Sequence, residues 1–236
     1  MTAFRIPGPL GLNGKYLLPP LEGVFGQAFV PGPLDPLNFR SEATLPHPTG
    51  LPPVSGTTNS SSPAKTIAWG KSVTAEFKSK VLLIAAELET NPDFLMAAMA
   101  FESAETFSPS IFNAAGSGAV GLIQFMPNTA SGLGTSSELL AKMSAVDQLD
   151  CVKKYFLPYK GRISALDDLY MVILWPSAVG KSTDYVLFYK DDKKHPKLYA
   201  QNKGLDVNAD GKITKAEAAA QVRSKLDKGL KSNHAG

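Results

Sequence analysis

The sequence predicts a mainly α-helical fold, and two observations support this prediction. From residue 72 onward, apolar residues recur every three or four positions, which is the spacing of one face of a helix. Ser, Thr or Asn stands just before several of these stretches, and Pro stands near their ends. We expect three segments: an arm or linker over residues 1–66, a helical domain over 67–200, and a polar loop with a final helix over 201–236.

Composition narrows the possible classes of protein. The chain has 236 residues, of which 44% are hydrophobic, which is enough for one sizeable core. A net charge of +3 is too small to indicate a nucleic-acid partner. The one cysteine, Cys151, excludes an internal disulfide and is expected to be a core thiol. No apolar run reaches the roughly 18 residues of a membrane helix, and the first residues lack a secretory signal pattern.

The first segment, residues 1–66, is rich in Pro, Gly, Ser and Thr, as in 6–9, 18–20 and 30–33. This composition indicates extended, turn-rich chain rather than long helices. Apolar residues such as Phe4 and Phe25 recur in it, so a disordered linker, a packed arm and an attachment arm all stay open. We expect an arm that is partly ordered.

The helical domain begins with a helix over about 73–88, in which Val73, Phe77 and Val81 start a 3.6-residue rhythm. A second helix follows, for which Asn91 is a good N-cap and Pro92 suits the first position. Its residues 94–101 are apolar on almost every side, so this second helix should be buried.

A carboxylate, Glu102, ends this apolar helix. Partial burial disfavours the charged form, so we expect the pKa of Glu102 to rise from about 4.3 towards roughly 6. Such a group can donate a proton near neutral pH. The alternative is that Glu102 simply begins a solvated loop.

Glycines at 116, 118 and 121 then allow tight turns, and 121–126 is expected to start a short helix. Further helices should be capped by Ser136 or Ser137, by Ser144 and by Ser164. Tyr170 lies in the middle of the last of these helices, at core spacing.

Part of this stretch resembles the lytic transglycosylases, which are lysozyme-like enzymes that cut the glycan strands of peptidoglycan. The resemblance rests on Glu102-Ser103, Phe107-Ser108-Pro109 and the block 118–127, with Thr129-Ala130 after it. A third block of that family, Ala-Tyr-Asn-Ala-Gly, is missing, and the nearest segment is 169–176, which contains Tyr170. The chain is similar in this respect to cell-wall enzymes of bacteriophages.

The resemblance implies a lysozyme-like fold and a single catalytic carboxylate, Glu102, which acts first as acid and then as base. The 6-hydroxyl of the muramic sugar attacks and leaves a 1,6-anhydro end. Substrate-binding residues would be Ser103, Gly121, Gln124, Phe125 and Tyr170, although a surface position for Gln124 and a core role for Tyr170 stay open. The candidates for a second carboxylate, Glu105, Asp167 and Asp168, are poor.

Two other functions stay open. One is a hydrolase on the same scaffold, as in goose-type lysozymes. The other is a non-catalytic structural protein of a phage particle that calcium stabilises. For the enzyme we expect a monomer that acts on peptidoglycan, sometimes with other virion proteins. We expect it in the virion, or in the host cytoplasm before delivery to the bacterial periplasm.

The last segment contains a loop that fits the EF-hand calcium pattern position by position. The predicted ligands, in chain order, are Asp206, Asn208, Asp210, Lys212 through its backbone carbonyl, Thr214 and Glu217, with Gly211 at the sharp turn. Thr214 and Glu217 also form a capping box for the final helix. We therefore predict a structural Ca²⁺ ion, which the chemistry does not need. The alternative is a plain capped helix after a polar turn.

Overall fold

The computed structural model describes residues 65–114, 116–193 and 195–236. Apart from residues 65 and 66, the predicted N-terminal arm lies outside the described residues. The described chain from Thr66 to Gly236 lies in one compact unit. The final loop and helix, which the sequence set apart as 201–236, therefore pack within the same unit as the helical domain.

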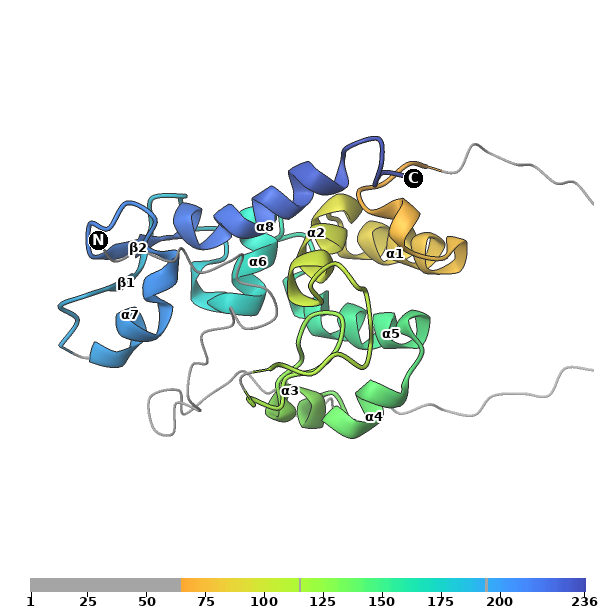
Figure 1. The fold of residues 1–236 in the computed structure, drawn as a ribbon, viewed down its shortest axis with the longest axis horizontal. Helices are drawn as coiled ribbons and strands as arrows, with labels where there is room; N and C mark the ends of the chain where they lie inside the picture. The colour runs from red at the N-terminus through yellow and green to blue at the C-terminus, as the bar shows by residue number, and fades with distance from the viewer. Residues whose placement is uncertain (1–64, 115, 194) are drawn as a thin grey trace, which may run out of the picture. The chain divides into compact units, whose positions relative to one another are not determined.

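The described part of the chain is mainly helical, as the sequence predicts (Figure 1). Its α-helices are α1 (Ala75–Leu88), α2 (Pro92–Glu102), α3 (Pro127–Gly132), α4 (Ser137–Lys142), α5 (Ala145–Phe156), α6 (Leu166–Leu174), α7 (Pro196–Asn202) and α8 (Lys215–Gly229). Single 3₁₀ turns are η1 (Gly70–Ser72), η2 (Leu157–Tyr159), η3 (Pro176–Ala178) and η4 (Lys203–Leu205). Two short strands, β1 (Val186–Tyr189) and β2 (Lys212–Thr214), pair antiparallel.

Local hydrogen bonds explain where the first two long helices begin. The Thr74 hydroxyl accepts from the Phe77 amide and starts α1. The Asn91 side chain accepts from the Asp93 amide, and Pro92 occupies the first turn of α2. The predicted cap and first residue of α2 are thus confirmed. Each cap satisfies a backbone N–H group that the first turn of a helix otherwise leaves without a partner.

The central helix of the core is α2, which packs against α1, α6 and α8. Its middle is fully buried, as the apolar sequence predicts. Figure 1 shows α8 running past α6 and α2, with the C-terminus close to the start of the described chain. Hydrogen bonds join these two ends, because the Ile67 amide donates to Gly236 and the Trp69 amide donates to Gly229. The buried Trp69 also donates its indole N–H to the Lys225 carbonyl.

Two predictions of helix starts are wrong. Residues 121–126 form a turn rather than a helix, because Gly121 and Gln124 have φ of 83° and 53°, which a right-handed helix cannot contain. The cap of α6 is Ala165, not Ser164. The Ser164 hydroxyl instead donates to the Asp168 carboxylate. The Ser136 and Ser144 caps are confirmed.

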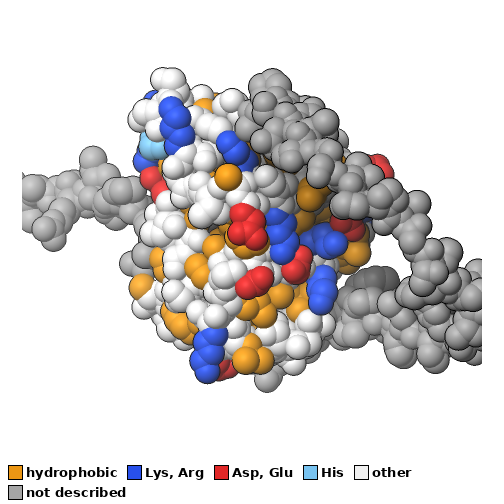
Figure 2. Space-filling view, turned by 90° about the vertical axis from the view of Figure 1, so that its right-hand side faces the viewer, with side chains coloured by type: hydrophobic (Ala, Val, Ile, Leu, Met, Phe, Trp, Pro, Cys, Tyr) orange, Lys and Arg blue, Asp and Glu red, His pale blue; other side chains and the backbone are white. Residues whose placement is uncertain are grey.

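Other features agree with the sequence or extend it. Cys151 is buried, as predicted for a core thiol. No helix among the described residues has the length and apolar character that a membrane crossing requires. One face of the molecule shows acidic and basic side chains close together, with hydrophobic ones scattered between them (Figure 2). That face carries charges of both signs rather than a basic surface.

Candidate active site

Glu102 is the last residue of α2 and lies at the edge of the core. Only 4% of the residue is exposed. The rest of the helix supplies apolar packing, since Leu95, Met99 and their neighbours are fully buried. A carboxyl group removed from water in this way is favoured in its protonated form. The sequence alternative, a carboxylate at the start of a solvated loop, does not fit this burial.

The turn after Glu102 has an unusual backbone. Ala104, Glu105 and Phe107 all have positive φ, between 51° and 67°, although none is a glycine. Ser103 supports this turn, because its hydroxyl donates to the Met99 carbonyl and accepts from the Phe107 amide. Ser103 has no exposed surface. Its visible role is therefore to shape the turn, and contact with a sugar stays a prediction.

Two tyrosines lie close to Glu102. Burial raises the pKa of Tyr170, and the negative charge of Glu102 raises it further. Burial, Tyr159 and Glu102 together raise the pKa of Tyr155. Since such an electrostatic effect acts at short range, the structure brings Tyr170 near the proposed acid, as the resemblance implies. Tyr170 is 3% exposed and packs edge-on against Phe101, so it also belongs to the core.

Tyr155 was missed by the sequence analysis. It lies on α5, and its hydroxyl donates to the Val172 carbonyl of α6 at 3.0 Å. Its ring packs edge-on against Phe125, with ring centres 6.1 Å apart. A tyrosine in an amphipathic helix is an ordinary core residue, so the sequence held no signal for its position beside Glu102.

The predicted sugar-binding residues Gly121, Gln124 and Phe125 lie together in one tight turn. The turn is closed by two backbone hydrogen bonds between Val120 and Phe125. The Gln124 side chain donates to the carbonyls of Ile111 and Gly121, and Gln124 and Phe125 are 3% and 2% exposed. The structure therefore gathers these residues into one turn, with most of their surface covered, and their contact with a sugar stays a prediction.

A second residue that the sequence analysis missed, Gln148, holds this turn from α5. Gln148 is fully buried. Its Oε1 accepts from the Leu122 amide at 2.7 Å, and its Nε2 donates to the carbonyls of Pro109 and Leu140. A Cβ atom added to Gly121 would come within 2.3 Å of the Gln148 Oε1 atom. Glycine is thus required at 121 both for its positive φ and for the space that Gln148 fills.

The three carboxylates considered as a second catalytic group, Glu105, Asp167 and Asp168, are each paired with basic residues of α8. Glu105 accepts from Lys225 and Lys228, each at 2.6 Å. On α6, Asp167 forms an ion pair with Arg223, and Asp168 forms an ion pair with the buried Lys215. Burial alone would raise the pKa of Asp168, but its hydrogen bonds, first of all from Lys215, lower it. These three carboxylates therefore serve as ion-pair partners.

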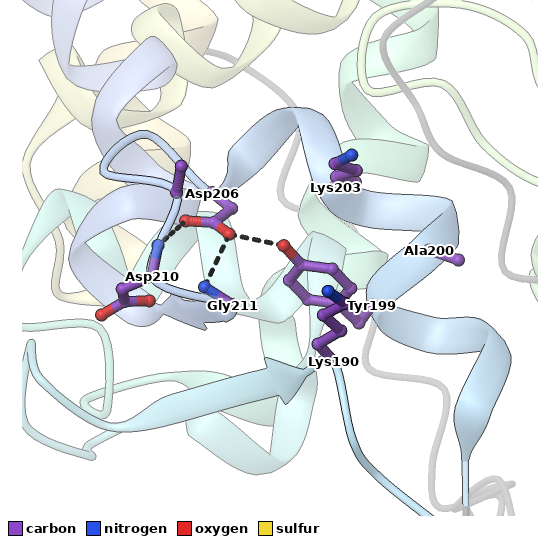
Figure 3. A pocket seen from close by; sticks show the side chains of 8 residues that line it. Lys190, Tyr199, Ala200, Lys203, Asp206, Asp210 and Gly211 are labelled. Atoms are coloured by element: carbon purple, nitrogen blue, oxygen red, sulfur yellow. Dashed lines mark hydrogen bonds between the residues drawn. The ribbon is translucent and has the colours of Figure 1, made fainter.

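The predicted calcium loop lies in another part of the unit, between η4 and α8 (Figure 3). Asp206 accepts hydrogen bonds from the amides of Asp210 and Gly211 and from the Tyr199 hydroxyl. The bond to Asp206 raises the pKa of Tyr199 to about 12. Asn208 also accepts from the Asp210 amide. The loop thus has the tight turn that its sequence predicts, with Gly211 at a φ of 82°.

The capping box at the end of this loop is confirmed. The Thr214 hydroxyl accepts from the Glu217 amide, and Glu217 Oε2 accepts from the Thr214 amide. Lys212 and Thr214 pair with β1 through β2. Among the described residues, no three His, Cys, Asp or Glu side chains stand where they could hold a metal ion.

A pocket of about 540 Å³ lies beside the loop (Figure 3). Its lining comprises Lys190, Tyr199, Ala200, Lys203, Asp206, Ala209, Asp210 and Gly211. None of the predicted sugar-binding residues lines this pocket.

Comparison with known proteins concerns the site around Glu102 and not the predicted calcium loop. No curated protein and no solved structure matches the chain. A family model described as "Transglycosylase SLT domain" matches residues 83–151, which run from α1 to α5. The matched stretch includes Glu102, Gln124 and Gln148, and it ends before Tyr170. Residues 83–151 are therefore similar to the transglycosylase SLT domain.

Proposed function

We propose that this chain is a peptidoglycan lytic transglycosylase in which Glu102 is the single catalytic carboxylate. The family match supports the substrate and the type of reaction. The observation that carries the role of Glu102 is its burial, together with the ion pairs that occupy the other nearby carboxylates. Because Glu105, Asp167 and Asp168 are held in ion pairs, we assign both proton transfers to Glu102.

The reaction proceeds in two proton transfers. Glu102 donates its proton to the glycosidic oxygen between the muramic sugar and its neighbour as the C1–O bond breaks. The resulting carboxylate then accepts the proton of the muramic 6-hydroxyl while that oxygen bonds to C1. The product is a 1,6-anhydro ring, no water is consumed, and Glu102 regains its proton.

The surrounding side chains support this double role. The buried position of Glu102 stabilises the protonated form that the first step needs. Tyr155 and Tyr170 lie within electrostatic reach of Glu102, and in our proposal they limit the access of water to it. Gln124 and the backbone of the 121–125 turn would orient the sugars.

The test is the variant Glu102→Gln, assayed with purified peptidoglycan and mass spectrometry of the released fragments. We expect loss of cleavage in this variant and anhydro ends from the unchanged protein. The control is Glu76→Gln, which changes an exposed carboxylate in the first turn of α1 and should leave the products unchanged. Reducing ends would instead identify a hydrolase on the same scaffold, and full activity of Glu102→Gln would remove Glu102 from the mechanism.

We also propose that the loop Asp206–Glu217 binds a structural Ca²⁺ ion. The donor set suits calcium, because Asp206, Asn208 and Asp210 offer oxygens from one tight loop. Glu217 Oε1 is buried and has no hydrogen-bond partner among the described residues, as expected of an oxygen available to a cation. Binding requires these side chains to turn towards a common point, since they do not converge as they stand.

This second proposal is tested by melting curves with Ca²⁺ and with a chelator. We expect Ca²⁺ to raise the melting temperature of the unchanged protein and to have much less effect on Asp210→Asn. The control Asp191→Asn changes an exposed aspartate outside the loop and should respond to Ca²⁺ like the unchanged protein. An equal melting temperature with and without Ca²⁺ would refute the calcium site.

A further inference from the structure

The turn that follows Glu102 is tied to a helix more than a hundred residues away in the sequence. Both carboxylate oxygens of Glu105 are used: Oε1 accepts from Lys225 and Oε2 from Lys228, at 2.6 Å each. Both lysines lie on α8, outside the stretch 83–151 that matches the family model. Burial alone would raise the pKa of Glu105, but the two lysines lower it, so the carboxylate is held in its charged form.

These ion pairs act on a backbone that needs support. Non-glycine residues avoid positive φ, yet Ala104, Glu105 and Phe107 all adopt it within four positions. Such conformations persist only where the surrounding structure holds them, and they often occur at functional sites. The Glu105 amide donates to the Ala100 carbonyl at 2.7 Å, which fixes the turn directly onto the end of α2.

A second anchor ties the same turn to α8. Phe107 is buried beside Trp69, with ring centres 6.2 Å apart. Trp69 donates its indole N–H to the Lys225 carbonyl, and the Lys228 ammonium lies 5.3 Å from the centre of a Trp69 ring. Helix α8 therefore holds the turn directly through the ion pairs at Glu105, and indirectly at Phe107 through Trp69.

We propose that Lys225 and Lys228 are positioning residues of the active site, which act through Glu105 to fix the direction of Glu102. This inference rests on the proposed function, because it assigns to α8 the task of holding the acid in line with the glycosidic oxygen. Placement matters because a shift of about 1 Å in a catalytic group can lower the rate of the chemical step a hundredfold. Neither lysine touches the substrate in this account.

The main test is Glu105→Gln, which keeps the size of the side chain and removes its charge. We expect kcat on soluble glycan strands to fall by about tenfold or more, with KM within about twofold, because the sugar contacts lie elsewhere. The matched control is Glu87→Gln, which breaks the Lys153–Glu87 pair between α1 and α5 at 3.2 Å. The control removes a single exposed ion pair, so it should lower the melting temperature only slightly and leave kcat unchanged.

Rescue separates positioning from general loss of structure. Reversing all three charges, with Glu105→Lys, Lys225→Glu and Lys228→Glu together, should restore much of the kcat that Glu105→Gln loses. If Glu105→Gln does not fold, the single variants Lys225→Met and Lys228→Met serve instead, since each leaves one ion pair in place. We expect each single variant to lower kcat with little change in KM.

The proposal is overturned if the folded Glu105 and lysine variants keep full kcat, or if KM and kcat change together. It is also overturned if the charge-reversed protein folds but stays as inactive as Glu105→Gln. Failure of the proposed function would look different, because Glu102→Gln would then cleave peptidoglycan like the unchanged protein.

Discussion

The close approach of Gln148 to Gly121 predicts how much stability the variant Gly121→Ala should lose. In Gly121→Ala the new Cβ would stand 2.3 Å from Gln148 Oε1, a distance at which one of the two must move. The left-handed backbone at 121 costs a non-glycine residue about 1–2 kcal/mol. If Gln148 moves, three hydrogen bonds weaken, each worth about 0.5–1.5 kcal/mol. We therefore expect a total loss of about 2.5–6.5 kcal/mol, the upper end applying if all three bonds are lost.

The chain offers a close control for this prediction. Gly134 has nearly the same positive φ, 78°, but a Cβ there would meet no atom within 4 Å. Gly134→Ala should therefore cost only the backbone strain of about 1–2 kcal/mol. Both variants are measured by urea unfolding followed by circular dichroism, with the slope m checked for constancy.

A double variant isolates the contact itself. In the background Gln148→Ala, the extra cost of Gly121→Ala should shrink to the cost of Gly134→Ala, because the clash partner is gone. The reasoning is refuted if Gly121→Ala costs no more than Gly134→Ala in the unchanged background. Activity should fall with Gly121→Ala even where the protein is fully folded, since our proposal assigns the backbone of the 121–125 turn to orienting the sugars.

Three further predictions concern the helices that surround Glu102. Lys215→Met leaves the buried Asp168 without its cation and should cost about 3–5 kcal/mol by calorimetry, whereas Lys153→Met at an exposed pair should cost less than about 1 kcal/mol. Because the folded pKa of Asp168 lies below its ordinary value of 3.8, its contribution to stability is present above that pH and is lost as the pH falls through the folded pKa. Asp168→Asn should therefore show a shallower loss of stability below pH 4 in urea unfolding at a series of pH values; an unchanged slope would contradict the ion-pair assignment. Tyr155→Phe leaves the Val172 carbonyl without its donor and should cost about 1 kcal/mol; no loss in thermal unfolding would show that this bond contributes nothing.

Features that depend on neighbours in the sequence were predictable. The Asn91 cap, the Ser144 cap and the Thr214–Glu217 capping box each involve residues two or three positions apart. The burial of α2 followed from the apolar composition of the helix, whereas the burial of Glu102 at its end stayed open against a solvated loop until the structure showed it. The fold class followed from the same periodicity.

Two helix starts predicted from neighbouring residues were wrong, because a contact with a distant residue or a left-handed backbone conformation determined the local structure. A helix was expected at 121–126, but the left-handed residues Gly121 and Gln124 make a turn that Gln148 holds from α5. Ser164 has the right type for a cap, yet its hydroxyl bonds to Asp168, which is itself fixed by Lys215 from α8. Propensity is a weak guide wherever such tertiary partners compete.

By itself, the sequence determined that the chain is mainly helical, that a carboxylate closes a buried helix at 102, and that a polar turn with a capping box precedes the last helix. Only the tertiary structure decided that Tyr155 lies within electrostatic reach of that carboxylate and that basic residues of α8 pair with Glu105 in the turn after it. The reason is physical: helix periodicity and caps are set by bonds that span three or four residues. The α8 lysines and Glu105, in contrast, are more than a hundred positions apart, and only the path of the folded chain brings their charges within hydrogen-bond distance.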